Sequence, residues 1–449
     1  AYGISWRAGL SLNPNSFPPQ HPPLNMDLDK ISRLAGEAEK EVTELCSGLV
    51  KINSAHPDGH TDEVVAYIKK YLDEHGIENE VHFMDPKKPN IVARIRGMTE
   101  RRIMWIGHLD VVPEGKPENW TYPPYSGKIT EDGFIWGRGA SDCKGACAAA
   151  MVAARVLNEL KEVPNSVDFW FTADEEIGGL DGARWLAEEK IFEGEVCIVG
   201  DGSPGPLDAP SIDLGCKGGA GTRLIARGKT AHGSTPFLGE NAIEKLIKVI
   251  PYVKRIAEFR LELPEELEPV IESTIQYMLR KEGLTPEQRE AVKRLFHYPS
   301  VSLNILNGGV KSNVVPDYAE AYFDIRLTPG SNPLRVRERI LELVKEAGVP
   351  GVTAEVRASP TAGYYESPET PFARQLAETV ERVTGRRPIF KILTGGTDAI
   401  SIKRFLGIPC LGFGAGMDEQ AHAPDEHNSI ENIMRSCKVY AAFPLIYRG

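Results

Sequence analysis

A histidine and an aspartate, separated by one residue, stand where an apolar stretch of the chain ends. Residues 103–106 are typical of a short buried strand, and His108 and Asp110 follow shortly after it. In an open α/β sheet, ligands gather outside the carboxyl ends of the strands. A neutral imidazole is a common zinc ligand, and a carboxylate can orient its second ring nitrogen. Alone, the pair is equally compatible with polar capping of a strand.

Further potential metal ligands occur at comparable places, each after a predicted strand or before a predicted helix. Together the candidates are His108, Asp142, Glu176, Asp201 and His422. Any one of them taken singly would be interpreted as a cap or a surface charge. Two histidines and three carboxylates suit a pair of zinc-like ions with one carboxylate shared between them. Five such residues at the ends of predicted elements are hard to explain as solvated faces.

Two adjacent glutamates, Glu175 and Glu176, follow the predicted strand at 167–172. Neighbouring like charges repel, so one of them should gain a cation partner or have its pKa raised. If Glu176 binds metal, Glu175 is free to hold an attacking water as general base. The alternative is an exposed acidic turn, which the buried character of residues 169–171 disfavours.

Four other features are ambiguous when each is taken alone. His232 lies in a loop, where a lone histidine is usually structural or merely exposed. Arg326 can bind a substrate carboxylate with two hydrogen bonds or can pair with a neighbouring acid, and Asn313 is equally open. The loop Gly395-Gly396-Thr397 can present backbone N–H groups to an anion, although ordinary turn chemistry also explains it.

Composition limits the classes of function. The 449 residues carry a formal net charge of -11 and contain no long Lys/Arg run, which argues against nucleic acid or an anionic membrane as the main partner. No apolar stretch is long enough to span a bilayer. The seven cysteines are scattered without a Cys-x-x-Cys pair, so a reduced, cytoplasmic setting is expected rather than a disulfide framework.

The order of predicted elements places these residues on an α/β scaffold. Strands alternate with helices over residues 27–214 and again over 359–449, which predicts a mostly parallel, doubly wound, metal-binding domain. Residues 28–51 are predicted as one helix from their three- and four-residue apolar spacing. Residues 13–23 are rich in Pro, Asn and Ser, and we expect a disordered tail or a non-native extension over residues 1–26.

Residues 215–358 interrupt this alternation and are predicted to form an inserted second domain. Its elements follow the order βαββαβ, the ferredoxin-like motif, when the stretch 263–297 is left aside. That stretch is charged, punctuated by prolines and helical in period, and we expect it to enlarge the inserted domain.

These motifs, in this order, resemble the dinuclear zinc amidohydrolases and exopeptidases that include glutamate carboxypeptidase, aminoacylase, acetylornithine deacetylase and succinyl-diaminopimelate desuccinylase. The similarity covers nearly everything after Met26. The stretches that carry it are Gly107-His108-Leu109-Asp110-Val111-Val112-Pro113, Gly137-Arg138-Gly139-x-x-Asp142-x-Lys144-Gly145, Asp174-Glu175-Glu176, Ala231-His232-Gly233, Lys311-Ser312-Asn313-Val314-Val315-Pro316, Asp324-x-Arg326, Gly395-Gly396-Thr397-Asp398 and His422.

The resemblance implies a role for each matching residue. His108 and Asp201 would hold one metal ion, Glu176 and His422 would hold the other, and Asp142 would bridge them. Glu175 would be the base, Asp110 would orient His108, and the peptide bond after Asp142 would be cis. The inserted domain would be a lid that forms a homodimer, with its His232 reaching the active site of the partner chain.

We therefore predict a hydrolase that uses two divalent cations, zinc or alternatively cobalt or manganese, to cleave an amide bond beside a free carboxylate. His232 would stabilise the oxyanion, while Arg326, Asn313 and the loop 395–397 would hold the substrate carboxylate. The substrate is expected to be an N-acyl amino acid or a short peptide, and the sequence does not choose among acetyl, succinyl, peptidyl and glutamyl groups. The alternative is a non-catalytic binding or regulatory protein on the same fold.

Overall fold

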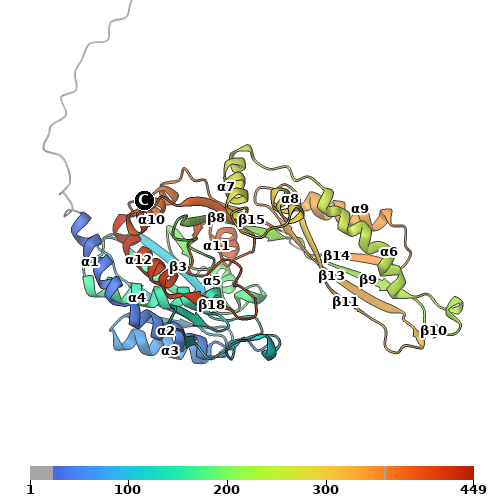
Figure 1. Cartoon of the computed structure of the whole chain (residues 1–449), viewed down its shortest axis with the longest axis horizontal. Helices are drawn as coiled ribbons and strands as arrows, with labels where there is room; N and C mark the ends of the chain where they lie inside the picture. The colour runs from blue at the N-terminus through green and yellow to red at the C-terminus, as the bar shows by residue number, and fades with distance from the viewer. Residues whose placement is uncertain (1–23, 358–360) are drawn as a thin grey trace, which may run out of the picture.

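The computed structural model describes residues 24–357 and 361–449, which form two lobes joined by a narrow waist (Figure 1). The large lobe contains the elements up to β8 and those from β15 onward. The small lobe contains β9 to β14 with helices α6 and α9. Among the described residues, no helix combines the length and the apolarity needed to cross a bilayer. The N-terminal extension expected over 1–26 lies almost entirely outside the described residues.

The large lobe is built on a mixed sheet whose central strands are parallel, which confirms the predicted fold class. Strand β3 runs parallel to both β6 and β7, β17 runs parallel to β7, and β16 runs parallel to β8. Strands β1, β2 and β15 are antiparallel to their neighbours. The bounds are β1 Glu78–His82, β2 Asn90–Ile95, β3 Arg102–His108, β6 Ser166–Thr172, β7 Val196–Val199, β8 Ser211–Gly219, β15 Thr361–Tyr365, β16 Ile389–Leu393 and β17 Cys410–Gly412.

Helices cover both faces of this sheet. They are α1 Leu24–Glu37, α2 Glu39–Lys51, α3 Asp62–Glu74, α4 Gly145–Leu160, α5 Ala183–Glu188, α10 Pro371–Thr384, α11 Ala399–Leu406 and α12 Ile430–Ile446. The single helix predicted over 28–51 is wrong, because α1 ends at Glu37 and α2 begins at Glu39. Ala38 between them has φ −90° and ψ 9°, which breaks the helical hydrogen-bond ladder while the apolar spacing continues.

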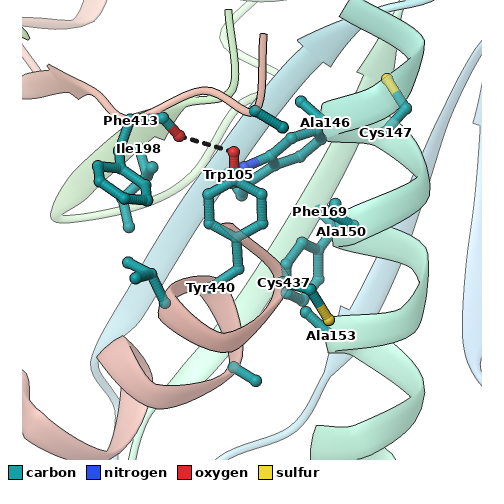
Figure 2. Close-up of a cluster of buried hydrophobic side chains, with 14 of the residues drawn as sticks. Trp105, Ala146, Cys147, Ala150, Ala153, Phe169, Ile198, Phe413, Cys437 and Tyr440 are labelled. Carbon is teal, nitrogen blue, oxygen red and sulfur yellow. Dashed lines mark hydrogen bonds between the residues drawn. The ribbon is translucent and has the colours of Figure 1, made fainter. Parts of the chain in front are cut away.

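The Ala-rich helix α4 packs closely against the sheet and α12 (Figure 2). Its small side chains Ala146, Ala150 and Ala153 are fully buried and leave room for the large ring of Trp105 on β3. Tyr440 of α12 lies 5.4 Å from that ring, centroid to centroid, and its hydroxyl donates a hydrogen bond to a backbone carbonyl beyond β17. Helix α12 is therefore part of the same core as β3, and its packing on Trp105 helps to hold this strand in place.

The small lobe has the predicted βαββαβ order and is ferredoxin-like. Its four long strands are antiparallel and lie in the order β11-β13-β9-β14, with a separate apolar core beneath α6 and α9. The last two residues of β13 pair with β8, so one sheet continues through both lobes. The bounds are β9 Thr222–Arg227, α6 Ala242–Lys254, β11 Ser300–Gly308, β13 Tyr318–Leu327, α9 Pro333–Glu346 and β14 Val352–Val356.

The stretch 263–297 does not enlarge the small lobe in the way we expected. It contains α7 (Glu268–Met278) and α8 (Pro286–Arg294), and α7 packs on strand β16 of the large lobe. Val270, Ile271 and Ile275 are buried in the large-lobe core because they share one face of α7. The Thr274 hydroxyl also accepts a hydrogen bond of 3.0 Å from the backbone N–H of Ile392. The insert leaves the small lobe and docks beside the large-lobe sheet.

Candidate metal centre

Strand ends and two loops bring the candidate ligands to one edge of the large-lobe sheet. His108 is the last residue of β3, and Glu176 follows β6 in a short 3-10 helix, Glu175–Ile177. Asp201 comes two residues after β7. Because β3, β6 and β7 are parallel neighbours, their carboxyl ends lie together. Asp142 precedes α4, and its peptide bond to the next residue is cis, as the resemblance implies.

Two groups of side chains have the spacing needed to hold a cation, and they share Asp142. The first group is His108, Asp142 and Asp201, and the second is Asp142, Glu176 and His422. Within each group, one ligand atom per residue lies within 4.8 Å of the others. The geometry therefore assembles all five candidates around two positions with one common carboxylate.

The two oxygens of Asp142 face different histidines. Its Oδ1 lies 2.9 Å from Nε2 of His108, and its Oδ2 lies 3.4 Å from Nε2 of His422. The same nitrogen of His422 is 3.0 Å from Oε2 of Glu176. His422 comes from the loop after β17 and has a left-handed backbone conformation, with φ 63°. One oxygen is thus available for each of two cations.

Asp110 contacts His108 through its backbone, and its carboxylate binds other groups. The backbone carbonyl of Asp110, not its carboxylate, lies at hydrogen-bond distance from Nδ1 of His108, at 2.9 Å. The carboxylate is fully buried and accepts the N–H groups of Glu175 and Glu176 at 3.1 Å each. It also lies 2.9 Å from Nε2 of His56. Asp110 therefore orients His108 through the backbone and fixes the turn that carries both glutamates.

The sequence analysis missed His56, which had no recognisable ligand context. It lies in a loop before α3 and is brought to Asp110 by the fold. Hydrogen bonding to Asp110 raises the pKa of His56, and Asp110 has a lowered pKa despite its burial, partly because of that bond. The contact with His56 keeps the Asp110 carboxylate charged. A charged carboxylate is a strong hydrogen-bond acceptor for the backbone N–H groups of Glu175 and Glu176.

The clustered carboxylates create a strong demand for positive charge. Burial, together with the nearby Asp142, raises the pKa of Asp201 to about 8, and burial raises the pKa of Glu175 well above its ordinary value. Hydrogen bonds to Asp142 and Glu176 raise the pKa of His422 to about 10. Nitrogen and carboxylate donors of this kind suit Zn²⁺ in chemistry and number. The residues present fit a pair of divalent cations, which would replace protons as the balancing charge.

A pocket opens over this cluster and contains several other candidates. Besides the candidate ligands Asp142, Glu176, Asp201 and His422, it is lined by Glu175, Arg326, Gly395, Gly396 and Thr397. Arg326 sits on β13 at the junction of the lobes, where its Nε hydrogen-bonds Asp324 at 2.9 Å. The insert forms part of the wall through Thr274, Tyr277 and Met278. The pocket therefore combines contributions from both lobes and from the insert.

Two candidate residues, His232 and Asn313, lie away from this pocket. His232 belongs to the short strand β10, Ala231–His232, which pairs with β12, Val314–Val315, at the far end of the small lobe (Figure 1). Asn313 is adjacent, and its carbonyl accepts the N–H of Gly233 at 2.7 Å. His232 is exposed, and neither residue lines the pocket. The structure brings these two together, but at a distance from the metal cluster of the same chain.

Comparisons with known proteins agree with this geometry. The model of Peptidase family M20/M25/M40 matches residues 104–445. A probable succinyl-diaminopimelate desuccinylase of Staphylococcus epidermidis is 28% identical over 408 residues, which cover 87% of this chain and 93% of that protein. An uncharacterised metallohydrolase of Methanocaldococcus jannaschii is 27% identical over 434 residues, or 89% of this chain and 98% of that protein.

Solved structures share the fold. An M20 family metallo-carboxypeptidase from Sulfolobus solfataricus superposes with a TM-score of 0.77 at 24% identity, covering 91% of this chain and 99% of that chain. The dipeptidase Dug1p from Saccharomyces cerevisiae gives a TM-score of 0.78 at 17% identity, covering 94% and 98%. At these identities the structures support the fold alone. Because the family model spans most of the chain and the ligand cluster lies within it, the chain belongs to Peptidase family M20/M25/M40 and is a metallohydrolase.

Proposed function

We propose that this enzyme uses two zinc ions to hydrolyse an amide bond beside a free carboxylate in an N-acyl amino acid or a short peptide. The observation that carries the proposal is the pair of donor groups that share Asp142 in the pocket that also contains Glu175 and Arg326. Relatives named as a desuccinylase, a carboxypeptidase and a dipeptidase support this range of substrates.

Glu175 is the proposed general base. When bound, a pair of divalent cations activates water and polarises a carbonyl group. Glu175 lines the pocket beside the donor groups without belonging to either of them. Its pKa is raised by burial, so it can accept a proton from the attacking water and keep it long enough to donate it to the leaving nitrogen. Asp110 holds the backbone N–H of Glu175 and so fixes its position.

Arg326 and the loop 395–397 are the proposed site for the substrate carboxylate. The loop faces the guanidinium closely, since a Cβ added at Gly396 would lie 3.9 Å from Nη1 of Arg326. The absence of a side chain there leaves room for an anion between the arginine and the backbone N–H groups. A guanidinium can bind a carboxylate with two parallel hydrogen bonds, which fixes the orientation of the scissile amide.

The small lobe is the proposed lid and dimerisation domain, with His232 and Asn313 acting in the active site of the partner chain. Both residues lie at the tip of the lobe, away from their own metal cluster (Figure 1). Strand β11 forms an edge of the small-lobe sheet, and its exposed apolar residues Ile305 and Leu306 favour pairing across a two-fold axis. Residues 27–214 and 359–449 would form the catalytic domain and 215–358 the lid, except that the end of β8 and the helix α7 of the insert pack with the large lobe.

A cytoplasmic setting is proposed for the protein. The seven cysteines are all buried and unpaired, which suits a reducing compartment.

Hydrolysis of a substrate panel tests the proposal. Purified protein loaded with zinc, cobalt or manganese would be assayed against N-acetyl and N-succinyl amino acids and against dipeptides. We expect turnover of at least one class, and loss of that turnover after chelation with recovery on adding metal. A protein that binds these compounds without cleaving any of them would instead favour the non-catalytic alternative.

A further inference from the structure

The most extensively bonded carboxylate near the metal cluster is Glu426, which is not one of its ligands. Its side chain is fully buried, and it lies four residues after His422 in the loop that follows β17. It contacts the segment 138–142, and Asp142 in that segment is 284 residues earlier in the sequence. Burying a carboxylate costs free energy unless hydrogen bonds or a cation offset the lost hydration, so the partners of Glu426 matter.

Four donors converge on the two oxygens of Glu426. Oε1 accepts the backbone N–H groups of Ser141 and Asp142, at 2.9 and 3.0 Å. Oε2 accepts the backbone N–H of Gly139 at 3.0 Å and the Nη1 of Arg138 at 2.6 Å. Each oxygen therefore receives two hydrogen bonds, which a carboxylate can accept and a neutral amide of the same shape cannot.

The segment that these bonds hold has an irregular backbone. Gly139 has φ 89°, and Asp142 has φ −125° and ψ 92°, outside helical geometry although helix α4 begins at Gly145. Backbone N–H groups in such a segment lack the partners that a regular helix supplies. Glu426 supplies acceptors to three of them, including the N–H of Asp142 itself.

The neighbours of Glu426 fasten the same two segments together. The Asn428 amide donates to the carbonyl of Ala140 at 2.8 Å, and the Ser141 hydroxyl donates to the carbonyl of His427 at 2.8 Å. The loop after β17 carries His422, a candidate ligand of one cation position. The same loop is hydrogen-bonded to the segment that carries Asp142, the candidate ligand shared by both positions.

We propose that Glu426 is a positioning residue for the metal centre: it sets the backbone of Asp142 so that its two carboxylate oxygens face the two cation positions. This inference rests on the cation centre proposed above. It predicts that Glu426 controls cation affinity without contacting a cation, because any shift of the Asp142 backbone displaces Oδ1 from His108 and Oδ2 from His422 together. Outer partners of metal ligands typically change metal affinity by roughly 10–100-fold when mutated.

The test measures cation binding directly. Glu426→Gln keeps the shape but places an NH₂ group against converging donors. Glu426→Asp keeps the charge but withdraws the carboxylate by one methylene. Both should weaken Zn²⁺ and Co²⁺ binding by roughly 10–100-fold in titration calorimetry and alter the visible absorption spectrum of the Co²⁺ form. The exposed Glu431→Gln in α12 is the matched control and should leave affinity and spectrum unchanged.

The outcomes separate this inference from the proposed function. Wild-type protein that binds no divalent cation would overturn both. Wild-type binding with unchanged affinity and spectrum in both folded Glu426 variants would overturn the positioning role alone. If only Glu426→Asp retains full affinity, Glu426 acts through its charge rather than by position, and the inference is wrong. If neither variant folds by circular dichroism, the carboxylate serves the fold as a whole, which also contradicts the proposal.

Discussion

The large lobe and the small lobe hold their candidate functional residues in opposite ways. In the large lobe, His108 is 1% exposed and Asp110 is fully buried, and each contacts side chains or N–H groups distant in sequence: Nε2 of His108 lies 2.9 Å from Asp142, and the Asp110 carboxylate contacts His56 and Glu176. In the small lobe, His232 is exposed at the tip, and its Nδ1 bonds only two residues away, to the Ser234 hydroxyl at 2.7 Å. The large-lobe residues are therefore buried among their partners, whereas His232 in the small lobe is exposed on the surface.

This difference indicates which parts of the chemistry one chain can perform alone. The residues proposed for cation binding and proton transfer already lie together in the large lobe. The oxyanion role proposed for His232 requires a second chain, because β10 lies at the tip of the small lobe, away from the large lobe (Figure 1). Variants in the two lobes should therefore fail in different ways, and the following predictions use that difference.

Glu175→Gln should give the largest loss within the assembled site. The change is nearly isosteric and leaves the donor groups intact, so metals should remain bound while kcat falls by roughly 10²–10⁴-fold. Steady-state kinetics with metal analysis would check this, with the exposed Glu189→Gln as the control. Near-normal turnover would remove Glu175 from the mechanism.

His232→Ala should lower turnover by roughly 10²–10³-fold if it removes an oxyanion donor, and the loss should be repairable in trans. After subunit exchange with Glu175→Ala, activity should return to about a quarter of the wild-type value, because about half of the dimers are mixed and each has one complete site. Exchange would be followed with differently tagged chains. Proven exchange without recovered activity would place His232 outside the partner's site.

Arg326→Ala tests the junction between the lobes. The unmodified enzyme should prefer a substrate with a free carboxylate over its amide by roughly tenfold or more, and the variant should lose that preference. Comparing kcat/KM for the acid and the amide would measure it, with the exposed Arg337→Ala of α9 as control. Equal rates on acid and amide with the wild-type enzyme would show that no carboxylate is recognised.

Lys217 on β8 gives the smallest expected effect, which is on stability. Burial lowers its pKa to about 7, so between pH 7 and the unfolded value near 10.5 the unfolded chain binds more protons. The free energy of unfolding should then rise with pH in that window by at most about 1.4 kcal/mol per pH unit from this group, and stay flat below it. Lys217→Met should remove this slope in urea unfolding between pH 7.5 and 9.5. An unchanged slope would show that Lys217 is charged in the folded protein.

Periodicity predicted most of the large-lobe strands and the order of elements in the small lobe, because these segments alternate or run apolar for their whole length. Strand β8 was not predicted, since its glycines at 215, 218 and 219 weaken the strand signal although a long ladder through both lobes stabilises it. The docking of α7 on β16 could not be read from the insert, because an apolar helix face does not say which of two cores receives it.

The candidate ligands could be found because each is tied to the end of a local element. His56 and Glu426 were missed for the opposite reason. Their significance depends on contacts with Asp110 and with the segment 138–142, which are distant in sequence and leave no local pattern. His232 was identified by its motif, but no spacing in the chain indicates where its side chain lies relative to the metal cluster.

Metal content tests the central claim, a single carboxylate shared by two cation positions. Wild-type protein, Asp142→Ala and His422→Ala would be purified in parallel, equilibrated with zinc, freed of loose metal and measured by plasma mass spectrometry with a circular-dichroism check of folding. We predict about two zinc ions per chain in the wild type, one for each donor group, about one in His422→Ala, and loss of both in Asp142→Ala. Full occupancy in folded Asp142→Ala would contradict the shared-carboxylate centre.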